Sequence, residues 1–259
     1  MRTTHYIGLA FCLLALQGCE YYGHGSGEDA GDHHKTSYTG EQIAIGDGHA
    51  WTIVKTDIWG NPKAIGIQFT EEALENLPTG HAHGHETVLE LPVDKPVAPY
   101  DHVTLDWNEM GHEPPGVYDL PHFDIHFYMI GMTERDAIGP TDDEQFNKPM
   151  PDGFLPPMYL ETPGGVPSMG AHMIDLLSPE IAGTGIFTYT FIYGKYDGMM
   201  NFLEPMVTRD FLLSKTRVAS EIRRPDAYQT PGHYPDELTI CFDEDSGVYT
   251  ILMEGLEEF

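Results

Sequence analysis

Residues 121–130 read Pro-His-Phe-Asp-Ile-His-Phe-Tyr-Met-Ile, and this stretch decides the fold. Apolar and polar side chains alternate along it, which is the pattern of a β-strand whose two faces meet different surroundings. The apolar face, expected to be a core face, holds Phe123, Ile125, Phe127 and Met129. The opposite face holds His122, Asp124, His126 and Tyr128. Two imidazoles, a carboxylate and a phenol in one row predict a metal site or a polar, ligand-holding cavity.

The rest of the chain repeats strand-like patterns in short runs cut by its 28 glycines and 20 prolines. Strands are predicted at residues 50–57, 64–69, 87–91, 102–107, 122–129, 185–193, 199–203, 237–242 and 248–253. Residues 60–62 and 243–247 have the composition of hairpin loops. Only residues 71–77 and 208–214 have a helical period. We therefore expect an all-β domain with minor helix, either barrel-like or a sandwich of short antiparallel strands.

The start of the chain has the features of an export signal. An apolar run at residues 7–16 is too short to span a bilayer and leads into Leu16-Gln17-Gly18-Cys19. This ending resembles the bacterial lipoprotein signal, so we expect a signal peptide over residues 1–18 and a membrane anchor through lipidated Cys19. Glu20 in place of Asp favours the periplasmic face of the outer membrane, or the cell surface. The alternative is an ordinary secretory signal with a chance cysteine.

The composition changes again before the folded part begins. Residues 19–40 are rich in Gly, Asp, His and Ser and predict a flexible tether. Its histidines also allow a weak metal-scavenging tail (His24, His33 and His34). A single β-rich domain is expected over residues 41–259, with residues 138–165 as a lid or crossover. Cys241 is expected to be a buried, small apolar residue and the one free thiol of the mature chain.

Charge restricts the partners of the protein. The formal net charge is −28 at pH 7, and nucleic acids and anionic lipid surfaces repel a protein of this charge. A nucleic-acid partner is therefore not expected.

Several motifs around the opening strand resemble a known family. They are residues 107–118, which lead into 121–128, and later residues 167–172, 193–198 and 202–206. In order, they resemble a domain-of-unknown-function family of exported bacterial β-rich proteins, whose structural representative is a sigma-E/anti-sigma-E-controlled protein of a thermophilic bacterium. The resemblance covers residues 45–255 and is most specific at 111–128. It implies a β-rich fold and a homo-oligomer, and it brings no established activity.

Strand geometry restricts which of these side chains can share an ion. Residues two apart on one face lie roughly 6–7 Å apart, and residues four apart lie roughly 13 Å apart. His122 and His126 therefore cannot bind one ion together without a bulge, whereas Asp124 can partner either. His172 and Glu204, each beside a Gly or Pro turn, would complete a site that suits Zn, Fe, Mn or Cu. The alternative is a polar cluster with the histidines bonded to Tyr118, Tyr128 or backbone carbonyls.

Two further motifs allow more than one interpretation. His112-Glu113 before Pro114-Pro115-Gly116 is either an acid/base pair at a cavity mouth or part of a rigid turn. In residues 80–86, His83 and His85, followed by Glu90, partly match the first cupin motif, but Val97 stands where that motif has glycine. A surface turn that binds metal loosely is the better interpretation. No serine-nucleophile elbow, phosphate-binding glycine loop or His-Glu-x-x-His helix is present.

Three functions remain open from the sequence. The first is a lipid-anchored protein whose cavity binds a metal or small ligand through His122, Asp124, His126, His172 and Glu204. The second is a non-catalytic, oligomeric envelope or stress-related protein with structural histidines. The third is a metal-dependent, cupin-like enzyme with Glu204 or Glu113 as general base and the metal activating water or dioxygen.

Overall fold

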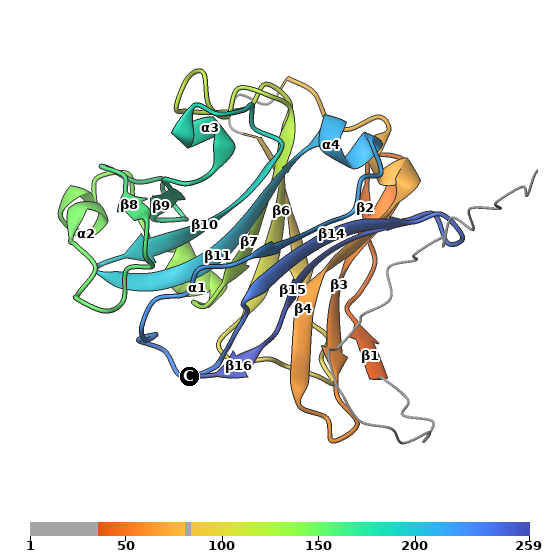
Figure 1. The fold of residues 1–259 in the computed structure, drawn as a ribbon, viewed down its shortest axis with the longest axis horizontal. Helices are drawn as coiled ribbons and strands as arrows, with labels where there is room; N and C mark the ends of the chain where they lie inside the picture. Colours follow the sequence, from red (N-terminus) through yellow and green to blue (C-terminus); the bar gives the residue numbers. More distant parts are fainter. Residues whose placement is uncertain (1–35, 81–83) are drawn as a thin grey trace, which may run out of the picture.

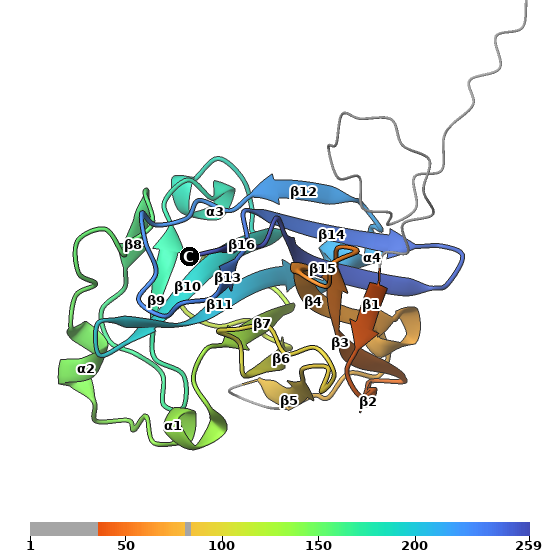
Figure 2. The same cartoon turned by 90° about the horizontal axis from the view of Figure 1, so that it is seen from below.

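The computed structural model describes residues 36–80 and 84–259, which form two large antiparallel sheets packed face to face (Figures 1 and 2). The first sheet has the spatial order β1 (Thr36–Thr39), β3 (Gly48–Thr56), β4 (Pro62–Thr70), β15 (Val248–Glu254), β14 (Glu237–Asp243) and β12 (Val218–Glu221), with β2 (Ile43–Ile45) paired to β3. The second has the order β5 (His85–Glu90), β6 (His102–Asn108), β7 (His122–Tyr128), β11 (Met199–Thr208), β10 (Tyr189–Tyr196), β9 (Ala171–Asp175) and β8 (Tyr159–Glu161). Two short strands, β13 (His233–Tyr234) and β16 (Glu257–Glu258), pair with each other.

The sandwich alternative is confirmed, and the barrel alternative is wrong, because the sheets do not close on themselves. The hydrophobic core lies between them. Phe123, Ile125 and Phe127 of β7 are at most 2% exposed and belong to this core, which confirms the predicted apolar face. The ring of Phe123 lies 6.2 Å from that of Phe69 on β4, so the two sheets meet there. Full burial of such side chains contributes about 1.5–3 kcal/mol each.

Each strand predicted from the sequence overlaps an observed strand, and both predicted hairpins form. The largest difference is β11, which was expected to end at Leu203 and continues to Thr208. Glu204-Pro205 indicated an end because proline has no N–H for a sheet ladder. The strand instead continues through it, and its pairing with β7 resumes where Met206 faces Asp124.

Short elements account for most of what the sequence did not predict. The predicted helical segments became η1 (Glu71–Leu74) and α4 (Arg209–Leu213), while α1 (Met132–Asp136), α2 (Asp143–Asn147) and α3 (Pro179–Ala182) were not expected. Residues 138–165 contain α2 and β8 and connect the central strand β7 with the edge of the second sheet. This path is a crossover.

The N-terminal boundary and the cysteine differ from expectation. Thr36–Thr39 pair with β3, so the folded domain includes residues assigned to the tether. Residues 1–35, with Cys19 and the tether histidines, lie outside the described residues. Cys241 is buried in β14 as predicted, but it is not a free thiol, so that part of the prediction is wrong. Among the described helices, none is long and apolar enough to cross a membrane.

The pairing of Gly194 with Phe202 predicts a sensitive position in the second sheet. A Cβ at Gly194 would lie 2.0 Å from the ring of Phe202. Gly194→Ala must displace that ring, and we expect the free energy of unfolding in urea to fall by about 1–3 kcal/mol, as in other overpacked sites. Gly131→Ala is the matched control, because a Cβ there has its nearest atom at 3.9 Å. Equal unfolding energies for both variants would show that the ring is not held in place.

Candidate metal centre

The candidate site lies on the face of the second sheet that points away from the core. β7 runs between β6 and β11, and all of its residues are buried. Its polar row is therefore buried as well as its apolar row. The loop 109–121 and Phe187 cover the row: the ring of Phe187 lies 5.0 Å from Tyr118 and 5.2 Å from His122. Buried polar groups must find partners, because leaving them unpaired is costly.

Three strands bring His126, His172 and Glu204 together, as the metal hypothesis required; we call these residues cluster I. The pairs Leu203–Phe127 and Met206–Asp124 of β11 and β7 share one register, which brings Glu204 into line with His126. β9 supplies His172, which faces β10 at Gly194. One potential ligand atom from each of the three lies within 4.8 Å of the others. Nε2 of His126 is 3.4 Å from one carboxylate oxygen of Glu204, and Nε2 of His172 is 3.6 Å from the other.

Neighbouring side chains fix the orientation of His126. Its Nδ1–H donates to the Asp106 carboxylate at 2.8 Å, and the Thr104 hydroxyl donates to the same oxygen at 2.8 Å. The ring of Phe202 packs 5.0 Å from His126 and 5.5 Å from His172. A metal-binding histidine usually donates its second ring N–H to a carboxylate in this way. Asp106 was not predicted, although the alternation of residues 102–107 places it on the polar face of its strand.

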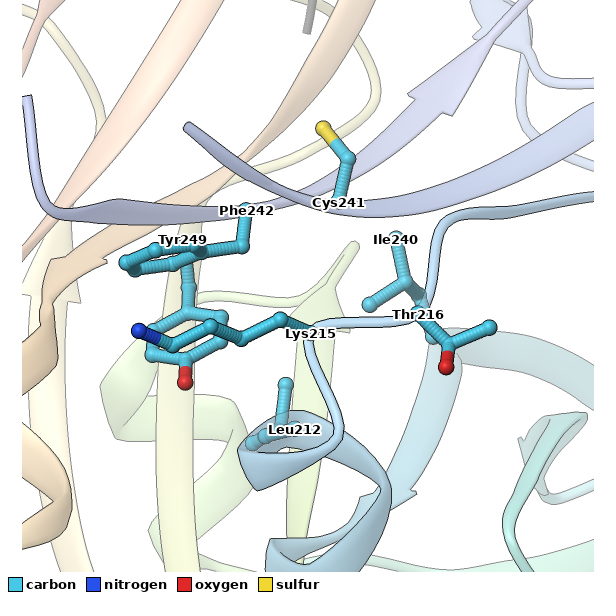
Figure 3. A pocket seen from close by; sticks show the side chains of 7 residues that line it. All are labelled: Leu212, Lys215, Thr216, Ile240, Cys241, Phe242 and Tyr249. Atoms are coloured by element: carbon cyan, nitrogen blue, oxygen red, sulfur yellow. The ribbon is translucent and has the colours of Figure 1, made fainter. Parts of the chain in front are cut away.

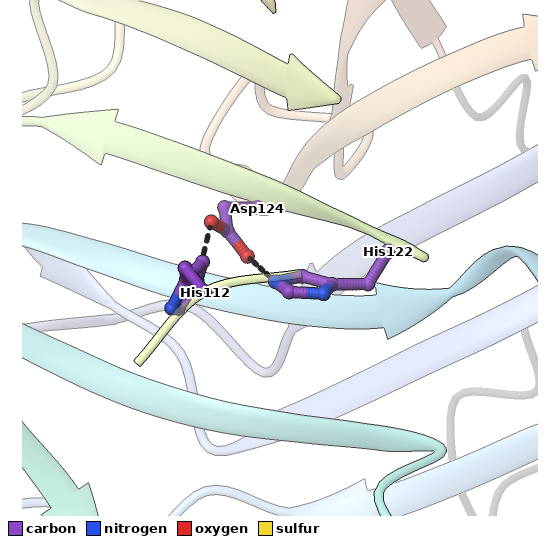
Figure 4. Close-up of side chains that lie close together, drawn as sticks. All are labelled: His112, His122 and Asp124. Atoms are coloured by element: carbon purple, nitrogen blue, oxygen red, sulfur yellow. Dashed lines mark hydrogen bonds and ion pairs between the residues drawn. The ribbon is translucent and has the colours of Figure 1, made fainter. Parts of the chain in front are cut away.

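His112, His122 and Asp124 form a second group, cluster II (Figure 4). Asp124 lies between the two imidazoles, with its oxygens 3.1 Å from Nε2 of His112 and 3.0 Å from Nε2 of His122. The amide of Asn108 donates to Asp124 at 2.8 Å. Each histidine donates its Nδ1–H to a backbone carbonyl, His112 to Glu113 at 2.7 Å and His122 to Leu120 at 2.6 Å.

The structure thus separates the two histidines of the opening strand, as their spacing predicts. Asp124 partners His122 and not His126. His112 joins as a potential ligand, whereas the sequence suggested either an acid/base pair or part of a rigid turn. The carboxylate of Glu113 is on an exposed residue, and its carbonyl makes the contact with His112.

The structure shows only some of the hydrogen bonds that the polar-cluster alternative predicts. The backbone carbonyl expected as a partner is present for His122. The hydroxyls of Tyr118 and Tyr128, in contrast, have no hydrogen-bond partner among the described residues. Tyr128 contacts His126 by ring stacking at 5.6 Å, beneath the guanidinium of Arg135.

Burial and charge shift the protonation of the site. Burial raises the pKa of Glu204 to about 8, although His126 opposes this effect. Burial lowers the pKa of His126, but the carboxylates of Glu204 and Asp106 outweigh it and raise that pKa to about 9. Burial and the nearby His126 hold the pKa of His172 well below its usual value. His172 is therefore a neutral imidazole, the form that binds metals.

Cluster II holds a carboxylate in its charged form. Burial raises the pKa of Asp124, but His122 and His112 outweigh it and hold that pKa far below its usual value. Burial lowers the pKa of His112, but the hydrogen bond and charge of Asp124, together with Glu113 and Glu204, outweigh burial and raise that pKa to about 9.

Each cluster has one partly exposed histidine. The side chain of His172 is 22% exposed and that of His112 is 34% exposed, while the remaining members are at most 8% exposed. In each cluster, this histidine is the member that solvent contacts most.

Two described pockets lie elsewhere. One, of about 140 Å³, lies between α4 and the β14–β15 hairpin (Figure 3). Its lining is Leu212, Lys215, Thr216, Ile240, Cys241, Phe242 and Tyr249. The Nζ of Lys215 lies 4.0 Å from the ring centre of Phe242. The other pocket, of about 160 Å³, belongs to the core near Phe69 and Phe123. Neither is lined by a residue of cluster I or cluster II.

Only part of the second histidine motif belongs to the described residues. His81 and His83 lie outside the described residues, and His85 begins the edge strand β5.

Comparisons with known proteins agree with the resemblance seen in the sequence. The model of the TTHB210-like family, described as "Hypothetical protein TTHB210", matches residues 59–107. No curated protein and no solved structure matches the chain. The matched segment includes Asp106 and ends before the first residue of either cluster, so the function must be argued from the geometry of the site.

The raised histidine pKa values predict a pH-dependent stability of the metal-free protein. His112 and His126 stay protonated up to about pH 9 in the folded state, compared with 6.5 for an unperturbed histidine. The folded state therefore binds more protons between these two values. The free energy of unfolding should be highest below pH 6.5 and should fall as the pH rises to 9. Urea unfolding in the presence of EDTA measures this.

The variant His112→Asn should show a shallower decline with pH than the unsubstituted protein, because one of the two groups is removed. A stability that does not change between pH 6.5 and 9 would contradict the assignment of protonated histidines.

Proposed function

We propose that this chain is an exported, lipid-anchored envelope protein that binds a divalent transition-metal ion through His126, His172 and Glu204. The orientation of His126 carries the metal part of this proposal. Its Nδ1–H is fixed by Asp106, so in the neutral imidazole Nε2 presents a lone pair toward the carboxylate of Glu204.

A cation at cluster I would resolve an unfavourable arrangement. Nε2 of His126 and Oε2 of Glu204 are buried and have no hydrogen-bond partner in the part of the chain that the structure describes. A buried polar group without a partner costs roughly 1–3 kcal/mol. Imidazole nitrogen and carboxylate oxygen together are ligands for Zn, Fe, Mn or Cu.

The ligand set favours a site that remains open to exchange. Three protein ligands leave at least one coordination position for water or a small ligand. His172, the more exposed ligand, marks the side from which that position can be reached.

Binding is better supported than catalysis. Glu204 stands within the proposed ligand set, and Glu113 is exposed on its loop. Neither candidate general base is therefore placed to act on a molecule bound at the metal.

A structural role for the histidines is the second candidate. The contact of the His122 Nδ1–H with the carbonyl of Leu120 favours it, because such a bond satisfies a buried imidazole without a metal. In that case His126 would be protonated and paired with Glu204 as an internal ion pair, in an oligomeric envelope protein without metal.

The metal proposal predicts loss of binding at named residues. Protein purified without a histidine tag is expected to carry or bind Zn²⁺, Mn²⁺ or Cu²⁺, and His172→Gln should abolish one binding event. Asp106→Asn should weaken that event by about 10–100-fold, the usual effect of losing such a supporting carboxylate. His49→Gln is the control, because His49 is exposed and outside both clusters.

Elemental analysis measures the metal content of the protein, and calorimetric titration measures metal binding. Absence of any stoichiometric metal, together with an unchanged melting temperature after adding Zn²⁺, Mn²⁺ or Cu²⁺, would exclude metal binding and favour the structural role.

The anchor part of the proposal rests on Leu16-Gln17-Gly18-Cys19. In a bacterial host, the full chain should incorporate labelled palmitate and fractionate with membranes. Cys19→Ser should lose the label, while Cys12→Ser, within the expected signal, should keep it. Labelling that survives Cys19→Ser would contradict the anchor.

A further inference from the structure

The loop 109–121 is folded back on itself between β6 and β7. Gly111 has a φ of +69°, and a Cβ there would lie 2.1 Å from the carbonyl oxygen of Tyr118. The backbone N–H of His112 donates to that same carbonyl at 3.1 Å. The ring of Tyr118 lies 5.8 Å from the imidazole of His112. These contacts place His112 over the polar face of β7, facing Asp124.

The polar groups that join this loop to β7 converge on one carboxylate, that of Asp124. His112 and His122 each donate Nδ1–H to a backbone carbonyl, so in the neutral form each Nε2 carries a lone pair. Both lone pairs point at the carboxylate of Asp124, at 3.1 and 3.0 Å. These contacts are favourable only when a positive charge lies between the groups: a proton on the imidazoles in the metal-free protein, or a metal ion that replaces it.

Two of these atoms are also buried and lie 3.0 Å apart without a well-formed hydrogen bond between them. Nε2 of His122 and Oδ1 of Asp124 have no hydrogen-bond partner among the described residues. Their side chains are 0% and 8% exposed. A bound cation is the simplest group that would satisfy both atoms and the two imidazoles together.

We propose that His112, His122 and Asp124 hold a second divalent cation of the Zn²⁺ type, which fastens loop 109–121 to β7. This site shares no residue with cluster I and goes beyond the proposed function. The carbonyls that orient both imidazoles belong to the loop itself, at Glu113 and Leu120. Folding of the loop and binding of the ion are therefore coupled: each stabilises the other.

The two sites differ in what their ions do. In cluster I the ligands come from three strands of one sheet, which are held by backbone pairing with or without metal. In cluster II one ligand comes from a loop, so the ion changes how often that loop opens.

The experiment combines metal stoichiometry with hydrogen–deuterium exchange, using the full chain without a tag and Zn²⁺ as the probe. The unsubstituted protein should bind two Zn²⁺ ions per chain at the clusters, and His112→Gln and His172→Gln should each lose one. At a free Zn²⁺ concentration 100 times the Kd, exchange of residues 109–121 should slow by about 100-fold. Only His112→Gln should lose this effect, while His49→Gln should behave like the unsubstituted protein.

Each of the following outcomes would contradict a different part of the inference. A single ion that is lost in His172→Gln removes the second site and leaves the proposed function standing. Two ions without any change in loop exchange remove the fastening role. Loop protection that is equally strong in EDTA, and is lost in His112→Gln, shows that imidazolium–carboxylate pairs hold the loop. No bound ion at all overturns both this inference and the proposed function.

Discussion

Burial of a charged strand face is the constraint on which the rest of this structure depends. β7 lies at the centre of its sheet, and both its apolar and its polar residues are removed from water. The apolar face is satisfied by the opposite sheet. The polar face requires complementary groups from every side: Asp106 from β6, Glu204 from β11, and His112 from the loop above. The two neighbouring strands and the loop above β7 provide these groups.

The two histidines of β7 belong to different clusters, although the composition of this strand suggests a single site. Two histidines flank one aspartate in the sequence, yet each faces a different carboxylate, because residues two apart on one face lie roughly 6–7 Å apart. One polar row thus holds two independent clusters. Each has a buried carboxylate, a buried imidazole and one imidazole that solvent can reach.

Local pattern was enough to predict the longer strands and the faces of β7, because alternation and turn residues are local properties. It missed the short strands, among them β9, which carries His172. It could not predict which strands lie side by side. The meeting of His126, His172 and Glu204 depends on two strand pairings between distant segments, and Asp106 depends on a third. His112 was harder still, since no periodicity describes a loop that folds back. Gly111 was the available signal, because a glycine that requires a positive φ marks a reversal of the chain. Pro205 misled the prediction of β11, since a proline inside a central strand is unusual.

The contact between Phe202 and Gly194 also has an evolutionary consequence. The ring that packs against His126 and His172 occupies the space where any side chain at position 194 would begin. Selection therefore acts on the two positions together. A lineage that keeps an aromatic ring at 202 loses stability when it replaces glycine at 194, and one that replaces the ring with a smaller side chain removes that cost. Across relatives, the residues at positions 194 and 202 should therefore change together.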